Sequence, residues 1–251
     1  MQIGLIGCGN MARALARGWG RPVLCADPVR ERAVALARET GGEALDSNGE
    51  VARRGDLVVL CHKPAQLEEV AAELAEHARA VASILAGVTL ERLRGAYPGR
   101  PVYRLVPSLP VEVRAGVVVR AADRAQDPEL DGLVRALFAE LGQLVDVEES
   151  LLEVATGVMS CAPAYVALVA EAQVDAAVRH GMAAAQASEL VVQTLAGTAE
   201  LLRRRGYDTH AVRGEVTSPG GMTARGLAAL ERGGVRAAFA DALDAVLRPP
   251  R

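Results

Sequence analysis

Two glycine-rich segments hold the residues whose types and spacing are suited to chemistry. The first is the run Gly7–Ala12 (GCGNMA), which follows a short apolar stretch and opens a segment with apolar residues at helical spacing. The GxGxxA spacing also occurs in ordinary turns, but a strand before it and a helix after it are typical of a dinucleotide site. Gly7 permits the tight turn, and Gly9 lets a pyrophosphate approach the backbone. Ala12 lets the helix lie close to the sheet. We therefore expect a nicotinamide dinucleotide at the N-terminus of this helix, bound by Gly7, Gly9, Asn10, Met11 and Ala12.

Asp27 ends the next apolar run, at the distance from the glycines where an acidic residue binds the adenosine ribose hydroxyls of a dinucleotide. This position favours NADH over NADPH by a small margin. Arg30 and Arg32 follow closely, and a guanidinium there could hold the 2′-phosphate of NADPH instead. Alternatively, Asp27 is the N-cap of the helix after Pro28.

Lys63 and Pro64 follow the run Asp56–Cys61 (DLVVLC), which predicts a parallel strand buried on both faces. The carboxyl end of such a strand lies at the sheet edge where ligands bind in this fold class. We expect Lys63 and Pro64 to contribute to the cofactor site, the alternative being a solvated turn. Cys61 and His62 do not predict a nucleophile pair, because adjacent residues of a strand point to opposite faces.

The second glycine-rich segment is Ser218–Gly221 (SPGG), followed directly by a predicted helix with Thr223 in its first turn. Backbone N–H groups around Ser218, Gly220 and Gly221 at a helix start favour a bound carboxylate. The alternative is a plain turn between two helices, with Thr223 as the cap.

Strands and helices alternate over the first half of the chain, which predicts an α/β class with a mostly parallel sheet. From about residue 148 the pattern is entirely helical. We expect a dinucleotide-binding Rossmann domain at residues 1–148 and an all-α substrate-binding and dimerisation domain at 149–251. The expected strands are 2–7, 23–26, 56–61, 80–86, 102–105, 117–120 and 144–146, and the expected helices of the first domain are 10–18, 30–40, 65–77, a helix from 90, and 127–141.

Composition excludes several classes of function. The net charge is −3 and aromatic residues make up 3% of the chain, which argues against a nucleic-acid binder. The four cysteines are far apart and form no CxxC pair, so we expect reduced thiols and no metal.

The N-terminus has no signal-peptide pattern, which indicates a cytoplasmic protein. The uncharged stretch Val154–Ala170 is interrupted by polar residues and Pro163, which favours a buried helix of a soluble domain over a membrane span.

Residues Glu215–Glu231 (EVTSPGGMTARGLAALE) resemble the signature of the pyrroline-5-carboxylate reductase family. Supporting segments run collinearly along the whole chain: GLIGCGNMARAL at 4–15, DLVVLCHKP at 56–64, SILAGVTLERL at 83–93 and PAYVALVAEAQVDAAVRHGM at 163–182. The resemblance implies reduction of the cyclic imine 1-pyrroline-5-carboxylate to proline, with hydride from NADPH or NADH. It also implies a helical domain that intertwines with a partner subunit, giving a homodimer or a higher homo-oligomer.

The resemblance also assigns roles to residues of the second half. Ser218, Gly220 and Gly221 are expected to bind the substrate carboxylate. Thr223 is expected to hydrogen-bond the imine nitrogen, orienting it or relaying a proton from water, because a threonine is a poor general acid. Glu171 matches a family acidic residue on an otherwise apolar helix, where a carboxylate is costly unless it is paired or faces a cleft. We expect it in the substrate cleft, a plain solvated position being the alternative.

Two segments depart from the family pattern. The usual Met-Pro-Asn-Thr-Pro reads Val106–Pro110 (VPSLP) here, so that Ser108 stands at the cofactor position in place of asparagine. A usual Ser-Gly-Ser-Gly-Pro reads Met159–Pro163 (MSCAP), with two glycines lost. These changes leave two further hypotheses open: a non-catalytic regulatory paralogue that binds NAD(P), and a reductase of a different, more apolar cyclic imine.

Overall fold

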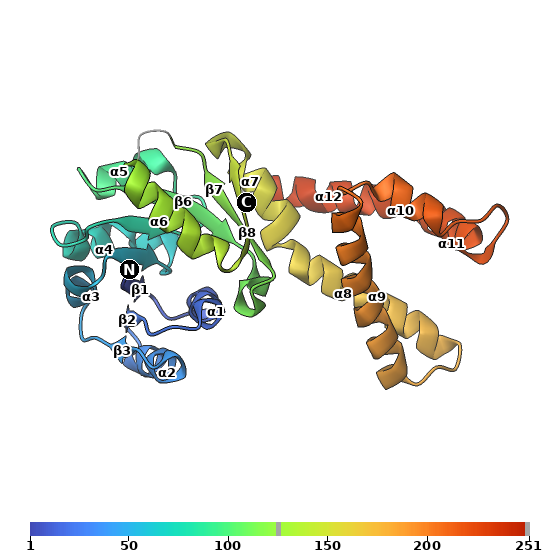
Figure 1. Ribbon diagram of the computed structural model, residues 1–251, viewed down its shortest axis with the longest axis horizontal. Helices are drawn as coiled ribbons and strands as arrows, with labels where there is room; N and C mark the ends of the chain where they lie inside the picture. Colours follow the sequence, from blue (N-terminus) through green and yellow to red (C-terminus); the bar gives the residue numbers. More distant parts are fainter. Residues whose placement is uncertain (124–126, 249–251) are drawn as a thin grey trace. The chain divides into compact units, whose positions relative to one another are not determined.

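The computed structural model describes residues 1–123 and 127–248, and the chain divides into two compact units, Met1–Pro163 and Ala164–Arg251. The first unit contains an eight-stranded sheet with the order β3-β2-β1-β4-β5-β6-β7-β8, in which only the β6–β7 pair is antiparallel (Figure 1). The first six strands are parallel and follow the order of a Rossmann fold, in which the strand order reverses between β1 and β4. The predicted α/β class is therefore confirmed. The strands are β1 (Ile3–Ile6), β2 (Leu24–Ala26), β3 (Glu43–Ala44), β4 (Leu57–Leu60), β5 (Val81–Ser83), β6 (Val102–Pro107), β7 (Gly116–Ala121) and β8 (Gly142–Val147).

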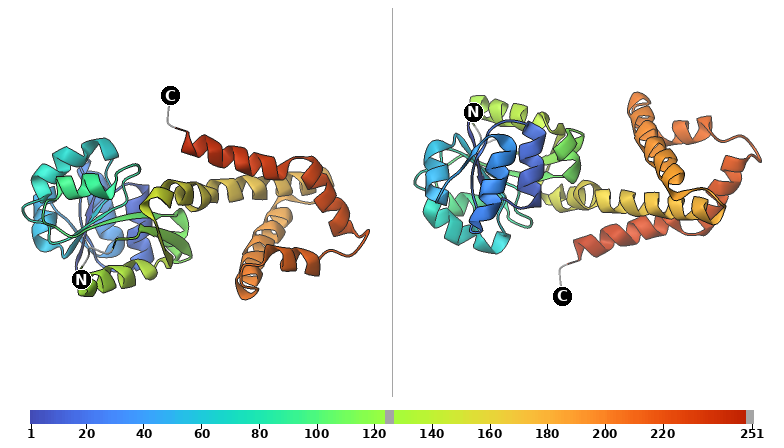
Figure 2. Two further views of the ribbon diagram at one scale, coloured as in Figure 1. Left: turned by 90° about the horizontal axis from the view of Figure 1, so that it is seen from above. Right: turned by 90° about the horizontal axis from the view of Figure 1, so that it is seen from below.

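Helices cover both faces of this sheet (Figure 2). In β4, Leu57 and Val59 face one buried cluster with α1, α2 and α6, whereas Val58 and Leu60 face another with α3, α4 and α5. Alternate side chains of a strand point to opposite faces, so a strand buried on both sides is a continuous apolar run. The helices are α1 (Asn10–Trp19), α2 (Arg30–Thr40), α3 (Asn48–Arg54), α4 (Leu67–Leu74), α5 (Leu90–Ala96), α6 (Pro128–Ala139) and α7 (Leu152–Ala155).

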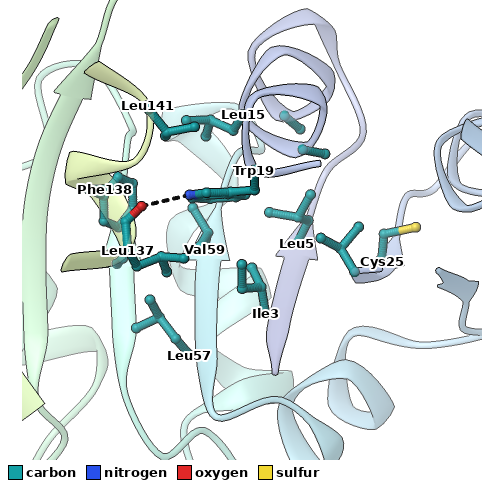
Figure 3. Close-up of a cluster of buried hydrophobic side chains, with 14 of the residues drawn as sticks. Ile3, Leu5, Leu15, Trp19, Cys25, Leu57, Val59, Leu137, Phe138 and Leu141 are labelled. Atoms are coloured by element: carbon teal, nitrogen blue, oxygen red, sulfur yellow. Dashed lines mark hydrogen bonds between the residues drawn. The ribbon is translucent and has the colours of Figure 1, made fainter. Parts of the chain in front are cut away.

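Trp19, at the end of α1, fixes the helix that carries the glycine turn. Its indole nitrogen donates to the carbonyl of Leu137 at 3.0 Å, and its ring packs edge-on against Phe138 with the centroids 5.6 Å apart (Figure 3). A buried indole N–H needs such an acceptor. The contact holds α1 against α6, and with it the position of the turn at its N-terminus.

The stretch 43–54 contains a strand and a helix that the sequence analysis did not predict. Strand β3 has two residues, too few for a hydrophobic pattern. Helix α3 has a polar sequence and is stabilised by Ser47, whose hydroxyl accepts a hydrogen bond from the backbone N–H of Glu50 at 3.2 Å. This N-cap, rather than apolar periodicity, marks the helix.

The first compact unit continues beyond residue 148. Leu152 of α7 is buried in the cluster with α3, α4 and α5. Arg104 of β6 is only 4% exposed, and its guanidinium donates to Glu149 at 2.9 Å and to Glu153 at 2.7 Å. Glu149 also accepts from the backbone N–H of Leu90, at 2.7 Å. These contacts join the start of the helical region to the sheet. The division at residue 148 stays a prediction, and residues 249–251 lie outside the described part of the chain.

The second unit is helical throughout its described residues, in agreement with the prediction. Its helices are α8 (Ala162–Arg179), which begins in the first unit, α9 (Ala184–Arg204), α10 (Thr209–Glu215), α11 (Met222–Arg232) and α12 (Val235–Leu247). Among residues 164–248 only Ala187 and Val212 are buried. Large apolar side chains are exposed instead, including Leu168 at 64% and Met222 at 82%. Since a helix must bury its apolar stripe against another surface, this unit is incomplete as a single chain.

The expected burial of residues 154–170 is wrong for the isolated chain. No residue of α8 is buried, because the surface that would cover it is not part of this subunit. Within the described residues, the continuous helical stretch Glu149–Arg179 is long and apolar enough to cross a membrane by length and composition alone. Its most apolar part has a mean hydropathy of 1.5, and only 11% of the residues in that part are buried. A helix that is covered by a partner subunit has the same length and composition.

Candidate active site

The glycine turn leaves an open helix N-terminus. Gly7 has a φ of +91°, and a Cβ on it would lie 2.9 Å from the backbone of Cys61 and His62. Gly9 has an extended backbone, and a Cβ on it would meet no atom within 4 Å. It is the N-cap of α1 and offers no side-chain cap, so the first N–H groups of the helix have no intrahelical acceptor. Space in front of Gly9 and free N–H donors together suit a pyrophosphate.

Asp27 holds this turn to the end of β2. One carboxylate oxygen accepts from the backbone N–H of Cys8 at 2.7 Å, and the other accepts from Val29 at 2.8 Å. The capping alternative is wrong, because α2 begins at Arg30 and its N-cap is Val29. Each carboxylate oxygen keeps a second lone pair, so the ribose role of Asp27 stays a prediction. Arg30 forms an ion pair with Asp46, and Arg32 is exposed.

A pocket of about 240 Å³ opens next to the turn, across the carboxyl ends of three strands. Met11, from the first turn of α1, lies in its wall, and its contact with a cofactor stays a prediction. Most of the other wall residues are apolar, and the end of the first unit supplies Glu153, Thr156 and Ser160. The complete lining is Met11, Cys61, His62, Ile84, Leu85, Ala86, Gly87, Val106, Pro107, Glu153, Thr156 and Ser160.

Cys61 and His62 both line this pocket, although the sequence analysis placed them on opposite faces. Strand β4 ends at Leu60, so the alternation of side chains no longer applies to the two residues after it. Burial raises the pKa of the Cys61 thiol to about 12, which keeps it protonated and unreactive. Burial also lowers the pKa of His62, which is therefore neutral near pH 7.

Lys63 and Pro64 lie directly after β4, at the predicted edge of the sheet. Pro64 begins a short 3-10 helix, and the backbone N–H of Lys63 donates to the Gln66 side chain at 3.3 Å. Lys63 is the only lysine of the sequence, and its side chain is exposed. Its contact with a cofactor stays a prediction.

The second glycine-rich segment forms a tight loop before α11. Gly220 has a φ of +69°, and the N–H of Gly221 donates to the carbonyl of Ser218 at 3.0 Å. The positive φ favours glycine at position 220, and a Cβ on Gly221 would lie 2.4 Å from the Ser218 hydroxyl oxygen, which would have to move. Gly221 is the N-cap of α11, and the exposed Thr223 is the second residue of the helix. The alternative in which Thr223 is the cap is therefore wrong.

Comparison with known proteins agrees with both glycine-rich segments. Residues 2–87 match the family described as NADP oxidoreductase, coenzyme F420-dependent, and residues 149–249 match pyrroline-5-carboxylate reductase dimerisation. Pyrroline-5-carboxylate reductase of Synechocystis sp. is 36% identical over 99% of this chain and 96% of the relative. That of Thermus thermophilus is 37% identical over 99% of this chain and 97% of the relative.

The chain belongs to the pyrroline-5-carboxylate reductase family. A solved structure of the Plasmodium falciparum pyrroline carboxylate reductase with NADP bound has a TM-score of 0.87 and 25% identity, covering 98% of this chain and 95% of that chain. The match to the dimerisation family covers the helices that bury few residues on their own. The protein is therefore a homo-oligomer.

The two segments that depart from the family pattern meet at the pocket. The Ser160 hydroxyl donates to the carbonyl of Pro107 at 3.1 Å, which joins the 159–163 segment to the 106–110 segment. The Ser108 hydroxyl is buried between β6 and β7, where it accepts from the N–H of Val117 at 2.9 Å and donates to the Val117 carbonyl at 3.2 Å. The Ser108 side chain stabilises the antiparallel strand pair, and its predicted contact with the cofactor stays a prediction.

Glu171 is exposed near the middle of α8. A carboxylate on an uncovered helix face is solvated in a single subunit. Whether it faces a substrate cleft in the oligomer stays a prediction.

The two glycines of the first turn give a matched pair of variants. Gly7→Ala should lower the free energy of unfolding by at least about 1–2 kcal/mol, because the positive φ and the nearby backbone both oppose a Cβ. Gly9→Ala should leave stability nearly unchanged but weaken NADPH binding about tenfold, since its methyl group would occupy the space used by the pyrophosphate. Chemical denaturation and calorimetric titration measure the two effects. Tight NADPH binding by Gly9→Ala would contradict the proposed path of the cofactor.

Proposed function

We propose that this protein reduces 1-pyrroline-5-carboxylate to proline with NADPH or NADH. The observation that carries the proposal is the full-length match to pyrroline-5-carboxylate reductases, together with an open glycine turn and an intact Ser218–Gly221 loop. A bound nicotinamide cofactor supplies the hydride. The open space at Gly9 and the unpaired N–H groups of α1 fit its pyrophosphate, and Asp27 or Arg32 would bind its adenosine ribose.

The chain's own residues have two tasks in this reaction. We propose that the N–H groups of Gly220 and Gly221, with Ser218, hold the substrate carboxylate at the start of α11. Thr223 donates or accepts a hydrogen bond at the imine nitrogen and orients it while the neighbouring carbon is reduced. Glu171 completes the proposed substrate site.

A spectrophotometric assay of the purified protein with pyrroline-5-carboxylate and each of NADH and NADPH tests the proposal. Substrate-dependent loss of absorbance with either cofactor supports it. Cofactor binding without turnover would instead indicate the non-catalytic paralogue. Turnover of a less polar cyclic imine alone would indicate a reductase of a different substrate. The apolar pocket wall and the altered segments at Pro107 and Ser160 favour this hypothesis over the non-catalytic paralogue.

We further propose a homodimer as the smallest assembly, located in the cytoplasm. Because residues 164–248 bury only two side chains within the chain, the apolar faces of α8 to α12 need a second copy. Light scattering at micromolar concentration should give a mass of at least twice 26.2 kDa. A monomeric mass would contradict the assembly and leave these faces unexplained.

A further inference from the structure

His62 lines the pocket and has a ring nitrogen without a hydrogen-bond partner among the described residues. Its Nδ1 lies 2.9 Å from the Lys63 carbonyl oxygen. A carbonyl only accepts hydrogen bonds, so the proton of the neutral ring is on Nδ1 and Nε2 carries a lone pair. Nε2 is buried, and it has no hydrogen-bond partner among the described residues. A buried acceptor left unpaired is costly, which indicates a donor that the chain does not itself supply.

The other polar side chains of the pocket wall are already engaged. The Thr156 hydroxyl donates to the Leu152 carbonyl at 2.8 Å, and the Ser160 hydroxyl donates to the Pro107 carbonyl at 3.1 Å. Glu153 accepts from Arg104. Among the described residues of this wall, His62 is therefore distinguished by a buried side-chain nitrogen that has no hydrogen-bond partner at all.

The sheet order indicates which half of a dinucleotide reaches His62. The Gly7–Ala12 turn directly follows β1. In the sheet, β2 and the following Asp27 lie on one side of β1, and β4 to β6 lie on the other. In a Rossmann domain the pyrophosphate lies at the turn and the adenosine ribose lies at the acidic residue after β2. The nicotinamide riboside then falls on the β4 to β6 side, where the pocket is. This half carries hydroxyl and amide donors.

We propose that His62 Nε2 accepts a hydrogen bond from the nicotinamide riboside half of the cofactor, either from a ribose hydroxyl or from the carboxamide N–H. The inference rests on the proposed function, since it assumes that a nicotinamide dinucleotide binds at the glycine turn. His62 is placed for this contact by its backbone, which packs directly against Gly7. The ring acts as a neutral acceptor and determines cofactor affinity; it takes no proton from the substrate.

The test compares three full-length variants by calorimetric titration with NADPH. His62→Ala removes the acceptor and should weaken binding about 3- to 10-fold, the effect of one neutral hydrogen bond. His62→Gln can present its amide oxygen near the position of Nε2 and should stay within about twofold of the wild type. His77→Ala, at an exposed histidine of the same unit, is the matched control and should bind as the wild type does.

Two fragments of the cofactor locate the donor. The affinity for 2′,5′-ADP, which has only the adenosine half, should be the same in all variants. ADP-ribose keeps a second ribose but has no nicotinamide, so weaker binding by His62→Ala identifies a ribose hydroxyl and unchanged binding identifies the carboxamide. Either result supports the proposal.

Three results would overturn it: unchanged NADPH affinity in His62→Ala, an equal loss for 2′,5′-ADP, or an effect that appears only when substrate is present. Failure of the wild type to bind NADPH or NADH would instead remove the proposed function, so the two failures are distinguishable.

Discussion

Replacing both Glu149 and Glu153 by glutamine should lower the free energy of unfolding by about 2–4 kcal/mol. Arg104 is buried, and glutamine keeps the hydrogen bonds while removing both charges that compensate the guanidinium. Leaving a buried charge without its partner costs about 3–5 kcal/mol, and we expect a smaller value because both glutamates are partly exposed. The midpoint of chemical denaturation at a fixed protein concentration measures the loss.

Two comparisons make this prediction specific. Glu69→Gln with Glu91→Gln removes the same charge from exposed positions of the same unit and should change stability by less than about 0.5 kcal/mol. Arg104→Met should cost less than the double glutamine variant, because the two glutamates can turn to water whereas Arg104 cannot. A larger loss for Arg104→Met would show that side-chain packing, and not charge, is what the cluster contributes.

Thr223→Ala should lower kcat about 10- to 100-fold with a smaller change in KM, which corresponds to about 1.4–2.7 kcal/mol of transition-state stabilisation. In the proposed mechanism, the hydrogen bond from Thr223 to the imine nitrogen would strengthen as the carbon is reduced, whereas binding of the carboxylate would be shared by the ground and transition states. Steady-state kinetics with pyrroline-5-carboxylate measure the two constants. Thr223→Ser keeps the hydroxyl and should retain most of the rate.

The structure also predicts how Thr223→Ala should affect stability, which serves as a control. Gly221 is the N-cap of α11, and Thr223 lies one residue inside the helix with an exposed side chain. Loss of an N-cap costs about 1 kcal/mol, so Thr223→Ala should show no stability loss of that size. Full kcat in the alanine variant would remove Thr223 from the mechanism.

The parts of the fold that could be predicted are those in which the residue types of one short segment are enough to indicate its structure. The run Leu57–Leu60 is apolar because both of its faces are buried, and Gly7 and Gly220 stand where the backbone has a positive φ. Strand β3 and helix α3 were missed because two residues and a polar helix have no apolar period.

The candidate site was harder to predict where a residue depends on distant partners. Arg104 lies in a predicted strand, but its burial depends on glutamates 45 and 49 residues later in the chain. His62 was considered only as a partner of Cys61, because strand alternation does not show where β4 ends. Ser108 is expected at the cofactor only because it stands where the family has asparagine, and the sequence does not show that its hydroxyl bonds to Val117 across the strand pair.

The scarcity of buried side chains in residues 164–248 has a consequence for how the protein is made. The Rossmann unit has its own core and can form as soon as Met1–Pro163 has been synthesised. The helices after it gain most of their stability only on encounter with another subunit, so completing the fold is a second-order process. Refolding from denaturant should therefore have a fast phase independent of concentration and a slower phase that accelerates with it. Between the two phases the exposed apolar helices can aggregate as well as assemble, because both processes bury the same apolar faces against another chain.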